Sequence, residues 1–343
     1  MRTAVSLLVA ALLVAAASAA QAAEVDGPKV EWKFSTWGKQ RAFTAGIEKL
    51  AELVEQKTDG NFAIRIYYGE ALSKSRENLD GIKLGAFDGA QFCNFYHPGK
   101  NPAFMVFSLP FLPLGDWEVN RKVRNRVYQH PALIADMDRW GAMTYTSTFL
   151  PQYEFLGRGD PPHELSGWKG KRVRAGGGLG DAMEKLGAIK TTTTATEVYT
   201  GMQRGTMDAA SFPYTYSHVA YKIHEVAEWY TTNMSPGTSD CPVVLSKRSW
   251  QALPEQYRKL LEDVKEEVDR TQIQAYIDID KKNLPMLEKR LEEVTYTEAQ
   301  LEEFRRIAAK PVWDEWVAQN KDKFDAQGVL DLLLATAREA MKR

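Results

Sequence analysis

The chain has 343 residues, and its 44 Lys and Arg nearly balance its 45 Asp and Glu, which gives a formal net charge of −1. This balance lacks the basic field that nucleic-acid binding requires, so no nucleic-acid partner is expected. A chain of this length exceeds what one compact core usually holds, and we expect two lobes.

The N-terminus has the three parts of a secretory signal peptide. Met1-Arg2 gives a positive start, an apolar run extends from Ala4 to Ala17, and Ala20-Gln21-Ala22 forms an A-x-A cleavage site. The run is short for a bilayer-spanning helix, and no later segment reaches the roughly 18 apolar residues that one needs. We therefore predict a cleaved signal peptide over residues 1–22 and a periplasmic chain without direct membrane insertion. A retained N-terminal anchor is the alternative.

Strand and helix patterns follow one another in the first half of the chain. Val30, Trp32 and Phe34 alternate with polar residues, as expected for a strand. The elements predicted here are strand 30–35, helix 43–58, strand 62–68, helix 78–84, strand 88–92, helix 117–128 and strand 143–149. A β-α-β-α-β series with short loops is typical of a mostly parallel sheet covered by helices.

A second α/β series begins near Gly170. Its predicted elements are strand 171–174, helix 181–186, helix 197–204, strand 208–212, a mostly helical segment 214–223 and strand 243–246. The glycine run 176–180 lacks the Gly-x-Gly-x-x-Gly register and is interpreted as a flexible loop before a helix. Two such series predict lobe I from residues 23–148 plus about 245–285, and lobe II from residues 149–244.

The C-terminal part changes to charged helical sequence. A long helical region is predicted over 254–294, and Pro285 should kink or break it. A Thr297/Gln300 capping box begins a helix over 297–308, and two more helices are predicted over 311–319 and 326–341. We expect residues from about 286 to 343 to be helices packed on the lobes.

The sequence lacks the common motifs of enzymes and of metal-binding proteins. There is no phosphate-binding loop, no Gly-x-Ser-x-Gly elbow and no His-Glu-x-x-His helix, so we expect no catalytic residues, no cofactor and no metal. A cation held by acids such as Glu197, Asp208 or Asp240 is the less favoured alternative. Cys93 and Cys241 either form a disulfide or are two buried small hydrophobes, and the second reading is favoured.

Several fragments in order resemble one family. They are Gly170-Lys171-Arg172-Val173-Arg174, Glu197-Val198-Tyr199, the run from Met202 to Asp208, Leu109-Pro110-Phe111-Leu112, Leu186-Gly187-Ala188, and Trp250 followed by Leu253-Pro254. Together they resemble the solute receptors of TRAP (tripartite ATP-independent periplasmic) transporters. The resemblance implies an α/β, two-lobed periplasmic-binding-protein fold of type II-like topology, with hinge strands and a long helix spanning both lobes. It also implies a ligand between the lobes, whose carboxylate pairs with Arg174, and delivery to the small and large subunits of a sodium-driven membrane permease.

The sequence departs from the family pattern at two positions. Ala209 follows Asp208 where the family has Gly, and Phe212 replaces an Asn that usually helps to hold the substrate. We therefore expect a ligand other than the family's commonest small acids, with an aromatic or apolar body.

Arg174 is the leading candidate site residue, because a guanidinium offers two parallel donors that match a carboxylate. Strand alternation places Arg172 on the same side, and Arg174 is favoured because it ends the strand, where ligands of α/β sheets gather. The remaining candidates also lie near strand ends, and each has core packing as its alternative fate: Trp37, Phe92, Asn94, Phe95, Tyr96, Gln152, Tyr153, Phe212, Tyr214 and Tyr216.

These features favour a periplasmic solute-binding protein that closes on a small organic carboxylate. Two other functions compete with it: an exported α/β enzyme acting on organic acids, and a binding protein that serves an ATP-driven importer or a sensor kinase. Saturable binding without turnover separates the receptor from the enzyme, whereas neighbouring genes for two membrane subunits separate it from the importer protein.

Overall fold

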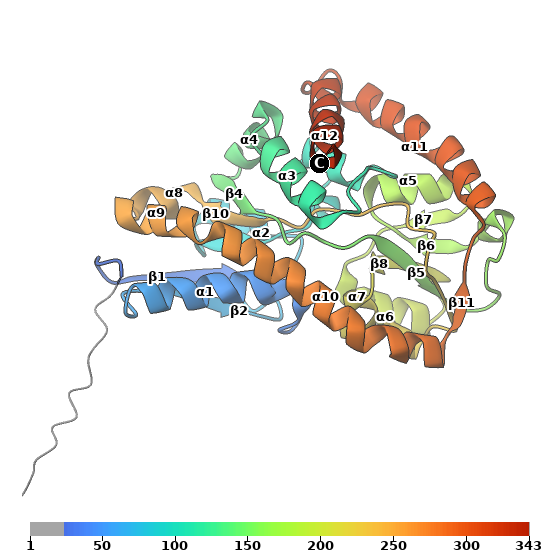
Figure 1. Cartoon of the computed structure of the whole chain (residues 1–343), viewed down its shortest axis with the longest axis horizontal. Coiled ribbons are helices and arrows are strands. Elements are labelled where there is room, and N and C mark those ends of the chain that lie inside the picture. The colour runs from blue at the N-terminus through green and yellow to red at the C-terminus, as the bar shows by residue number, and fades with distance from the viewer. Residues whose placement is uncertain (1–23, 343) are drawn as a thin grey trace, which may run out of the picture.

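The computed structural model describes residues 24–342, so the predicted signal peptide lies outside the described residues. Two β-sheets lie at opposite ends of the molecule, each with helices packed against it (Figure 1). The predicted two-part α/β fold is confirmed. No helix in the described range 24–342 is both long enough and apolar enough to cross a membrane.

Sheet A has the strand order β2-β1-β3-β10-β4. Its strands are β1 (Val30–Ser35), β2 (Phe62–Tyr67), β3 (Gly89–Gln91), β4 (Ala142–Thr146) and β10 (Val243–Ser246). β1 is parallel to β2 and to β3, with Phe34 opposite Ile66 and Gly89. β10 is antiparallel to both of its neighbours, β3 and β4. A strand from late in the chain thus lies inside a sheet whose other strands come from the first 146 residues.

Sheet B has the order β11-β9-β5-β8-β6-β7. Its strands are β5 (Tyr153–Gly157), β6 (Arg172–Arg174), β7 (Ile189–Thr191), β8 (Ala209–Pro213), β9 (Trp229–Thr231) and β11 (Glu292–Val294). The central strands β5 and β8 are buried over their whole length. β6 is parallel to β7 and β8, so Arg174 lies beside Ala210 at the end of its strand.

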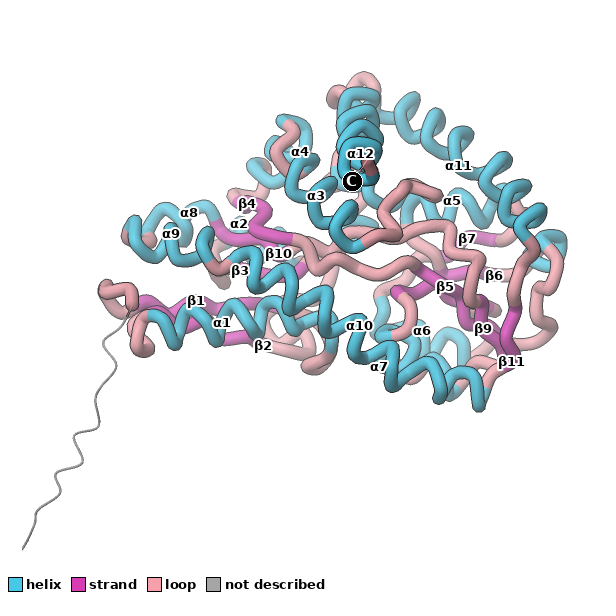
Figure 2. The backbone as a smooth tube through the Cα atoms, viewed as in Figure 1, coloured by secondary structure: helices cyan, strands magenta, loops and turns pink. Residues whose placement is uncertain are grey.

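The chain crosses between the two sheets three times (Figure 2). Residues 147–152 connect β4 to β5, residues 232–242 return from β9 to β10, and helix α10 (Lys265–Arg290) makes the third crossing. On the side of sheet A, the amide of Gln272 in α10 accepts from Gly46 N at 2.9 Å and donates to Ala42 O at 2.7 Å. On the other side, the Asp280 carboxylate accepts from Thr215 just before α7 (Tyr216–Ala220).

The remaining helices cover the sheets or join the two sides. They are α1 (Ala45–Lys57), α2 (Asn78–Leu84), α3 (Trp117–Val127), α4 (Pro131–Asp138), α5 (Gly177–Lys185), α6 (Ala195–Gln203), α8 (Lys247–Ala252), α9 (Glu255–Asp263), α11 (Glu298–Asn320) and α12 (Ala326–Met341). After β11 of sheet B, α11 packs on α5, and the chain then returns as α12 against α3 (Figure 1). The capping box predicted at Thr297 and Gln300 begins α11.

Of the kink or break predicted at Pro285, the break does not occur, and the gap expected before Pro311 is absent as well. α10 continues through Pro285, and a single helix, α11, runs through Pro311 where two helices were expected. An internal proline costs about 3 kcal/mol. Here the burial of flanking apolar side chains offsets that cost, because Leu287 is fully buried and Val312 and Trp316 pack into the core.

The prediction of a flexible glycine loop at 176–180 was also wrong. Four of these residues, from Gly177 onward, lie in the first turns of α5. A Cβ at Gly177 would lie 2.3 Å from the Ser108 hydroxyl oxygen, and one at Gly178 would lie 2.7 Å from the Ser108 carbonyl. The glycines therefore allow α5 to pack directly against the helical turn Phe104–Ser108.

Candidate binding cleft

Arg174 is buried between the two sheets, with only 2% of its surface exposed. Its Nη1 donates to Ser211 O at 2.8 Å, and its Nε and Nη2 donate to Thr193 O at 3.2 and 3.1 Å. The guanidinium carbon lies 4.5 Å from the ring centre of Phe212 and 5.3 Å from that of Phe95. All of these partners are uncharged, and Arg174 forms no salt bridge with a carboxylate among residues 24–342.

Arg172, two residues earlier, has a different environment. Its guanidinium binds the Asp208 carboxylate through two hydrogen bonds, Nη2 to Oδ1 at 2.6 Å and Nε to Oδ2 at 3.0 Å. Arg172 also keeps the pKa of that carboxyl below its usual range. The charge of Arg172 is thus neutralised by a neighbour, whereas Arg174 has no such carboxylate partner in the described part of the chain.

The cavity beside Arg174 has a volume of about 20 Å³, room for about one water molecule. Residues from both sides of the molecule line it: Trp37, Phe43, Cys93, Phe95, Tyr96, Leu150, Tyr153, Arg174, Ala195, Phe212, Pro213, Tyr216, Ser217, Tyr221 and Cys241. Burial raises the pKa of Tyr96, Tyr153 and Tyr216, so these phenols stay protonated at neutral pH. The walls therefore combine one cation, aromatic faces and neutral hydroxyl groups.

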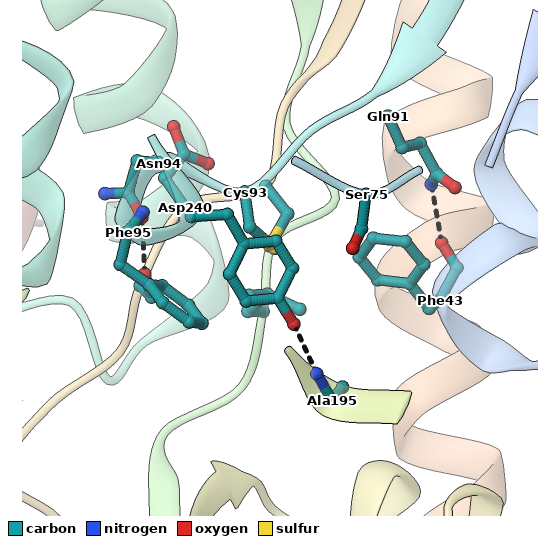
Figure 3. The surroundings of a disulfide bond; sticks show 12 residues. Phe43, Ser75, Gln91, Cys93, Asn94, Phe95, Ala195 and Asp240 are labelled. Atoms are coloured by element: carbon teal, nitrogen blue, oxygen red, sulfur yellow. Dashed lines mark hydrogen bonds between the residues drawn. A yellow bond between two sulfur atoms is a disulfide. The ribbon is translucent and has the colours of Figure 1, made fainter. Parts of the chain in front are cut away.

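One hydrogen bond crosses the cavity from the side of sheet A to the side of sheet B. The backbone N–H of Ala195 donates to the hydroxyl oxygen of Tyr96 at 2.8 Å (Figure 3). Ala195 is the first residue of α6, which a reciprocal Thr194/Glu197 capping box begins. Because the Tyr96 oxygen acts as the acceptor here, its own proton is left to point at a ligand.

The prediction that Cys93 and Cys241 stay unpaired was wrong, because they form a disulfide. Cys93 follows β3 and Cys241 precedes β10, and β3 and β10 are neighbouring strands, so strand pairing brings the two together. Asp240, beside this bond in Figure 3, forms an ion pair with Arg124 and accepts hydrogen bonds from the hydroxyls of Tyr128 and Ser147. Arg124 and Asp240 are both fully buried and lie 2.6 Å apart, which makes this an ion pair screened from water.

Seven of the eleven residues predicted as site residues line the cavity: Trp37, Phe95, Tyr96, Tyr153, Arg174, Phe212 and Tyr216. Their contact with a ligand stays a prediction. The other four do not line it, because other contacts hold them. The Asn94 amide binds Phe104 O, Phe95 N and Ser239, Gln152 accepts from Ser235, and Tyr214 packs against His218. Phe92 likewise packs against Phe104 and His97, away from the cavity.

Phe43 and Tyr221 are the aromatic lining residues that the sequence did not indicate. Phe43 lies in the turn just before α1, and the sequence placed it only as the first residue of a predicted helix. Tyr221 follows α7, and its ring stacks on Phe212 with ring centres 5.8 Å apart. Neither residue ends a strand, so the rule that identified the others does not find them.

A larger hollow of about 640 Å³ lies between α5, α11 and the loop around Pro98, and it shares Phe95 with the cavity. Two of its lysines are paired with carboxylates, Lys190 with Asp181 and Lys185 with Glu315. An anion gains less from a cation that is already paired, so we take the Arg174 cavity as the candidate site. In the described part of the chain, no three His, Cys, Asp or Glu residues are grouped so as to hold a metal ion.

The class of protein follows from comparison with known families. Residues 34–320 match the family described as bacterial extracellular solute-binding protein, family 7. The chain therefore belongs to this family. Among curated relatives, a monocarboxylate 2-oxoacid-binding periplasmic protein of Nostoc sp. is 23% identical over 266 residues, which cover 73% of this chain and 69% of the relative.

Solved structures of TRAP solute-binding proteins share the fold. One from Rhodoferax ferrireducens, in complex with copurified benzoate, has a TM-score of 0.81 at 18% identity and covers 92% of this chain and 99% of that one. Another from Desulfovibrio salexigens, with bound orotic acid, has a TM-score of 0.81 at 21% identity and covers 91% of this chain and 100% of that one. The resemblance seen in the sequence motifs is thus confirmed for the fold and the family.

Proposed function

We propose that this protein captures a small organic carboxylate in the periplasm and delivers it to a sodium-driven TRAP permease with small and large membrane subunits, without catalysing a reaction. The observation that carries the proposal is the buried Arg174 guanidinium, which has only neutral partners. A ligand carboxylate would supply the missing charge. Hydrogen bonds to charged groups are worth about 1.5–3 kcal/mol each, enough to fix the orientation of a small acid.

The lining of the cavity supports a ligand with an aromatic or apolar body. The Arg174 guanidinium lies over the ring of Phe212 and over that of Phe95. Flat rings bury much area and favour a flat partner. Benzoate and orotic acid, found in the two structural relatives, are flat ring acids of this kind.

Entry of the ligand requires the two sides of the molecule to separate. A cavity of about 20 Å³ does not admit an organic acid, and the Tyr96–Ala195 hydrogen bond closes it. We infer that residues 23–148 with about 245–285, and residues 149–244, move as two lobes about the crossing segments, and that the ligand selects the closed form by touching both. A permease then distinguishes the closed, loaded form from the open one.

Binding tests this proposal directly. A thermal-shift and tryptophan-fluorescence screen of organic acids should identify a ligand, because a ligand at about 100 times its dissociation constant adds about 2.7 kcal/mol of stability. Arg174→Ala should weaken binding roughly a hundredfold or more. Arg172→Gln is the matched control, since it removes a guanidinium from the same strand that Asp208 already neutralises. Full affinity in Arg174→Ala, or conversion of the acid to a product detected by NMR, would contradict the proposal.

A further inference from the structure

Arg41 places a second guanidinium at the edge of the same cavity, on the side of sheet A. Its guanidinium carbon lies 4.7 Å from the ring centre of Phe43 and 5.5 Å from that of Tyr221, and both of these rings line the cavity. Phe43 lies next to α1, whereas Tyr221 follows α7 below sheet B. Arg41 is therefore held between rings from the two sides of the cleft.

Only part of the hydrogen-bonding capacity of Arg41 is used. Nη1 donates to Trp37 O at 2.8 Å and to Lys39 O at 2.7 Å. Nε and Nη2 are buried and have no partner among the described residues. Buried donors without partners are rare in folded proteins, because they lose water without gaining a protein acceptor. Nε and Nη2 together form the edge of a guanidinium that binds a carboxylate through two parallel bonds.

No carboxylate of the described chain takes that place. The nearest acid along the helix, Glu48, is occupied by the Thr44 hydroxyl at 2.6 Å, the Tyr68 hydroxyl at 2.8 Å and the Gln40 amide at 2.8 Å. Arg41 thus resembles Arg174, because each cation is bound only by backbone carbonyls and aromatic rings.

We infer that the ligand is a dicarboxylate with a flat apolar body, whose first carboxylate binds Arg174 and whose second binds Nε and Nη2 of Arg41. This inference rests on the proposed function and specifies the class of its ligand. The two cations belong to opposite sides of the cleft, so a dianion reaching both would join them directly. Both guanidiniums are near enough to Tyr96 to oppose the rise that burial causes in the pKa of its phenol.

A purely structural role for Arg41 makes a different prediction. If Arg41 only fixed the backbone of Trp37 and Lys39, its loss would weaken the binding of every acid to a similar degree. If it binds a second carboxylate, its loss weakens dicarboxylates and leaves monocarboxylates nearly unchanged. The ratio of dicarboxylate affinity to monocarboxylate affinity therefore distinguishes the two roles of Arg41.

The experiment measures dissociation constants of benzoate, 4-hydroxybenzoate, phthalate, isophthalate and terephthalate by titration calorimetry on the full exported chain. In the unsubstituted protein we expect at least one aromatic dicarboxylate to bind about tenfold to a hundredfold more tightly than benzoate. Arg41→Met should reduce this ratio to near one while changing benzoate affinity little. Arg76→Met is the matched control, because Arg76 is an exposed guanidinium 6.0 Å from the Tyr96 ring and should leave the ratio intact.

Arg41→Lys provides a second variant, since an ammonium keeps the charge and can still reach the Trp37 carbonyl but lacks the two-bond edge. It should lower the ratio severalfold. The inference is overturned if benzoate or 4-hydroxybenzoate binds as tightly as every dicarboxylate, or if both Arg41 variants weaken benzoate and the dicarboxylates alike. If benzoate binding itself survives Arg174→Ala, the proposed site fails, which is a separate result.

Discussion

The hydroxyl oxygen of Tyr96 accepts a 2.8 Å hydrogen bond from the backbone N–H of Ala195, and this bond joins the segment after β3 to the first residue of α6. Tyr96 lies on the side of sheet A and Ala195 on the side of sheet B. Separation of the two sides, as proposed above, would break this bond.

Tyr96→Phe should accordingly weaken ligand binding while leaving the fold stable. The variant leaves the Ala195 N–H buried and unpaired in the closed form, at a cost of about 1–3 kcal/mol. Titration calorimetry with a ligand acid should show a roughly tenfold rise in dissociation constant. Tyr68→Phe is the control, because the Tyr68 hydroxyl binds Glu48 within one side of the molecule. Equal affinities in the two variants would contradict a role of Tyr96 in closure.

Asp240→Asn should strongly destabilise the protein. The substitution leaves the fully buried Arg124 guanidinium without a counter-charge, which typically costs about 3–5 kcal/mol. Urea unfolding measures this loss as a lower midpoint. Glu266→Gln breaks the exposed pair with Arg270 and should cost less than about 1 kcal/mol. A loss in Asp240→Asn as small as that of the control would show that Arg124 reaches water.

Glu154 should make stability depend on pH. Burial raises the pKa of its carboxyl from 4.5 to about 7. Hydrogen bonds from the Thr231 hydroxyl and the Ser235 N–H oppose this rise but do not cancel it. Between these two pH values the native state holds a proton that the unfolded chain releases, so the free energy of unfolding falls as pH rises. The loss is on the order of 3 kcal/mol across this window.

Glu154→Gln should flatten this dependence in urea titrations at a series of pH values. Glu302→Gln removes an exposed carboxylate of α11 and should leave the slope as it is. If both variants retain the slope of the unsubstituted protein, another group is responsible for it.

The Cys93–Cys241 bond should matter for stability more than for ligand choice. It closes a chain segment with a sequence separation of 148 residues, and loops of this length gain about 4–5 kcal/mol in the chain-entropy account. Reduction, or Cys93→Ser with Cys241→Ser, should lower the melting temperature by several degrees. An unchanged melting temperature after verified reduction would contradict this estimate.

Much of the fold could be predicted from the sequence, because alternation in strands and apolar spacing in helices depend on residues close together in the chain. Alternation identified β1, and β10 and α12 were predicted with the bounds that the structure has. The strands β7, β9 and β11, which were not predicted, have only three residues each, and alternation over three residues is a weak signal. Pro285 and Pro311 misled the helix prediction, because tertiary burial outweighed a local rule.

The part of the candidate site that could be predicted from the sequence consists of residues at the ends of strands, because the direction of a strand determines where its end lies. Strand ends were expected to meet at the cleft, and Arg174 and Phe212 do so. Phe43, Tyr221 and Arg41 reach the cleft through the packing of α1 and α7 against α10, a long-range relationship that no local spacing contains. The disulfide was missed for the same reason, since the pairing of β3 with β10 brings the cysteines together.

The fastening of residues 239–241 has a mechanical consequence. Cys241 forms the disulfide with Cys93, and the Ser239 hydroxyl donates to the Asn94 amide oxygen. Asp240 contacts Arg124, Tyr128 and Ser147. This end of the segment 232–242 is therefore held firmly to the side of sheet A. If the two sides rotate as proposed, we expect the change in backbone angles to fall before residue 239, near Gly237, whose φ of 138° few other residues adopt. The residues around Cys93 would then move together with sheet A.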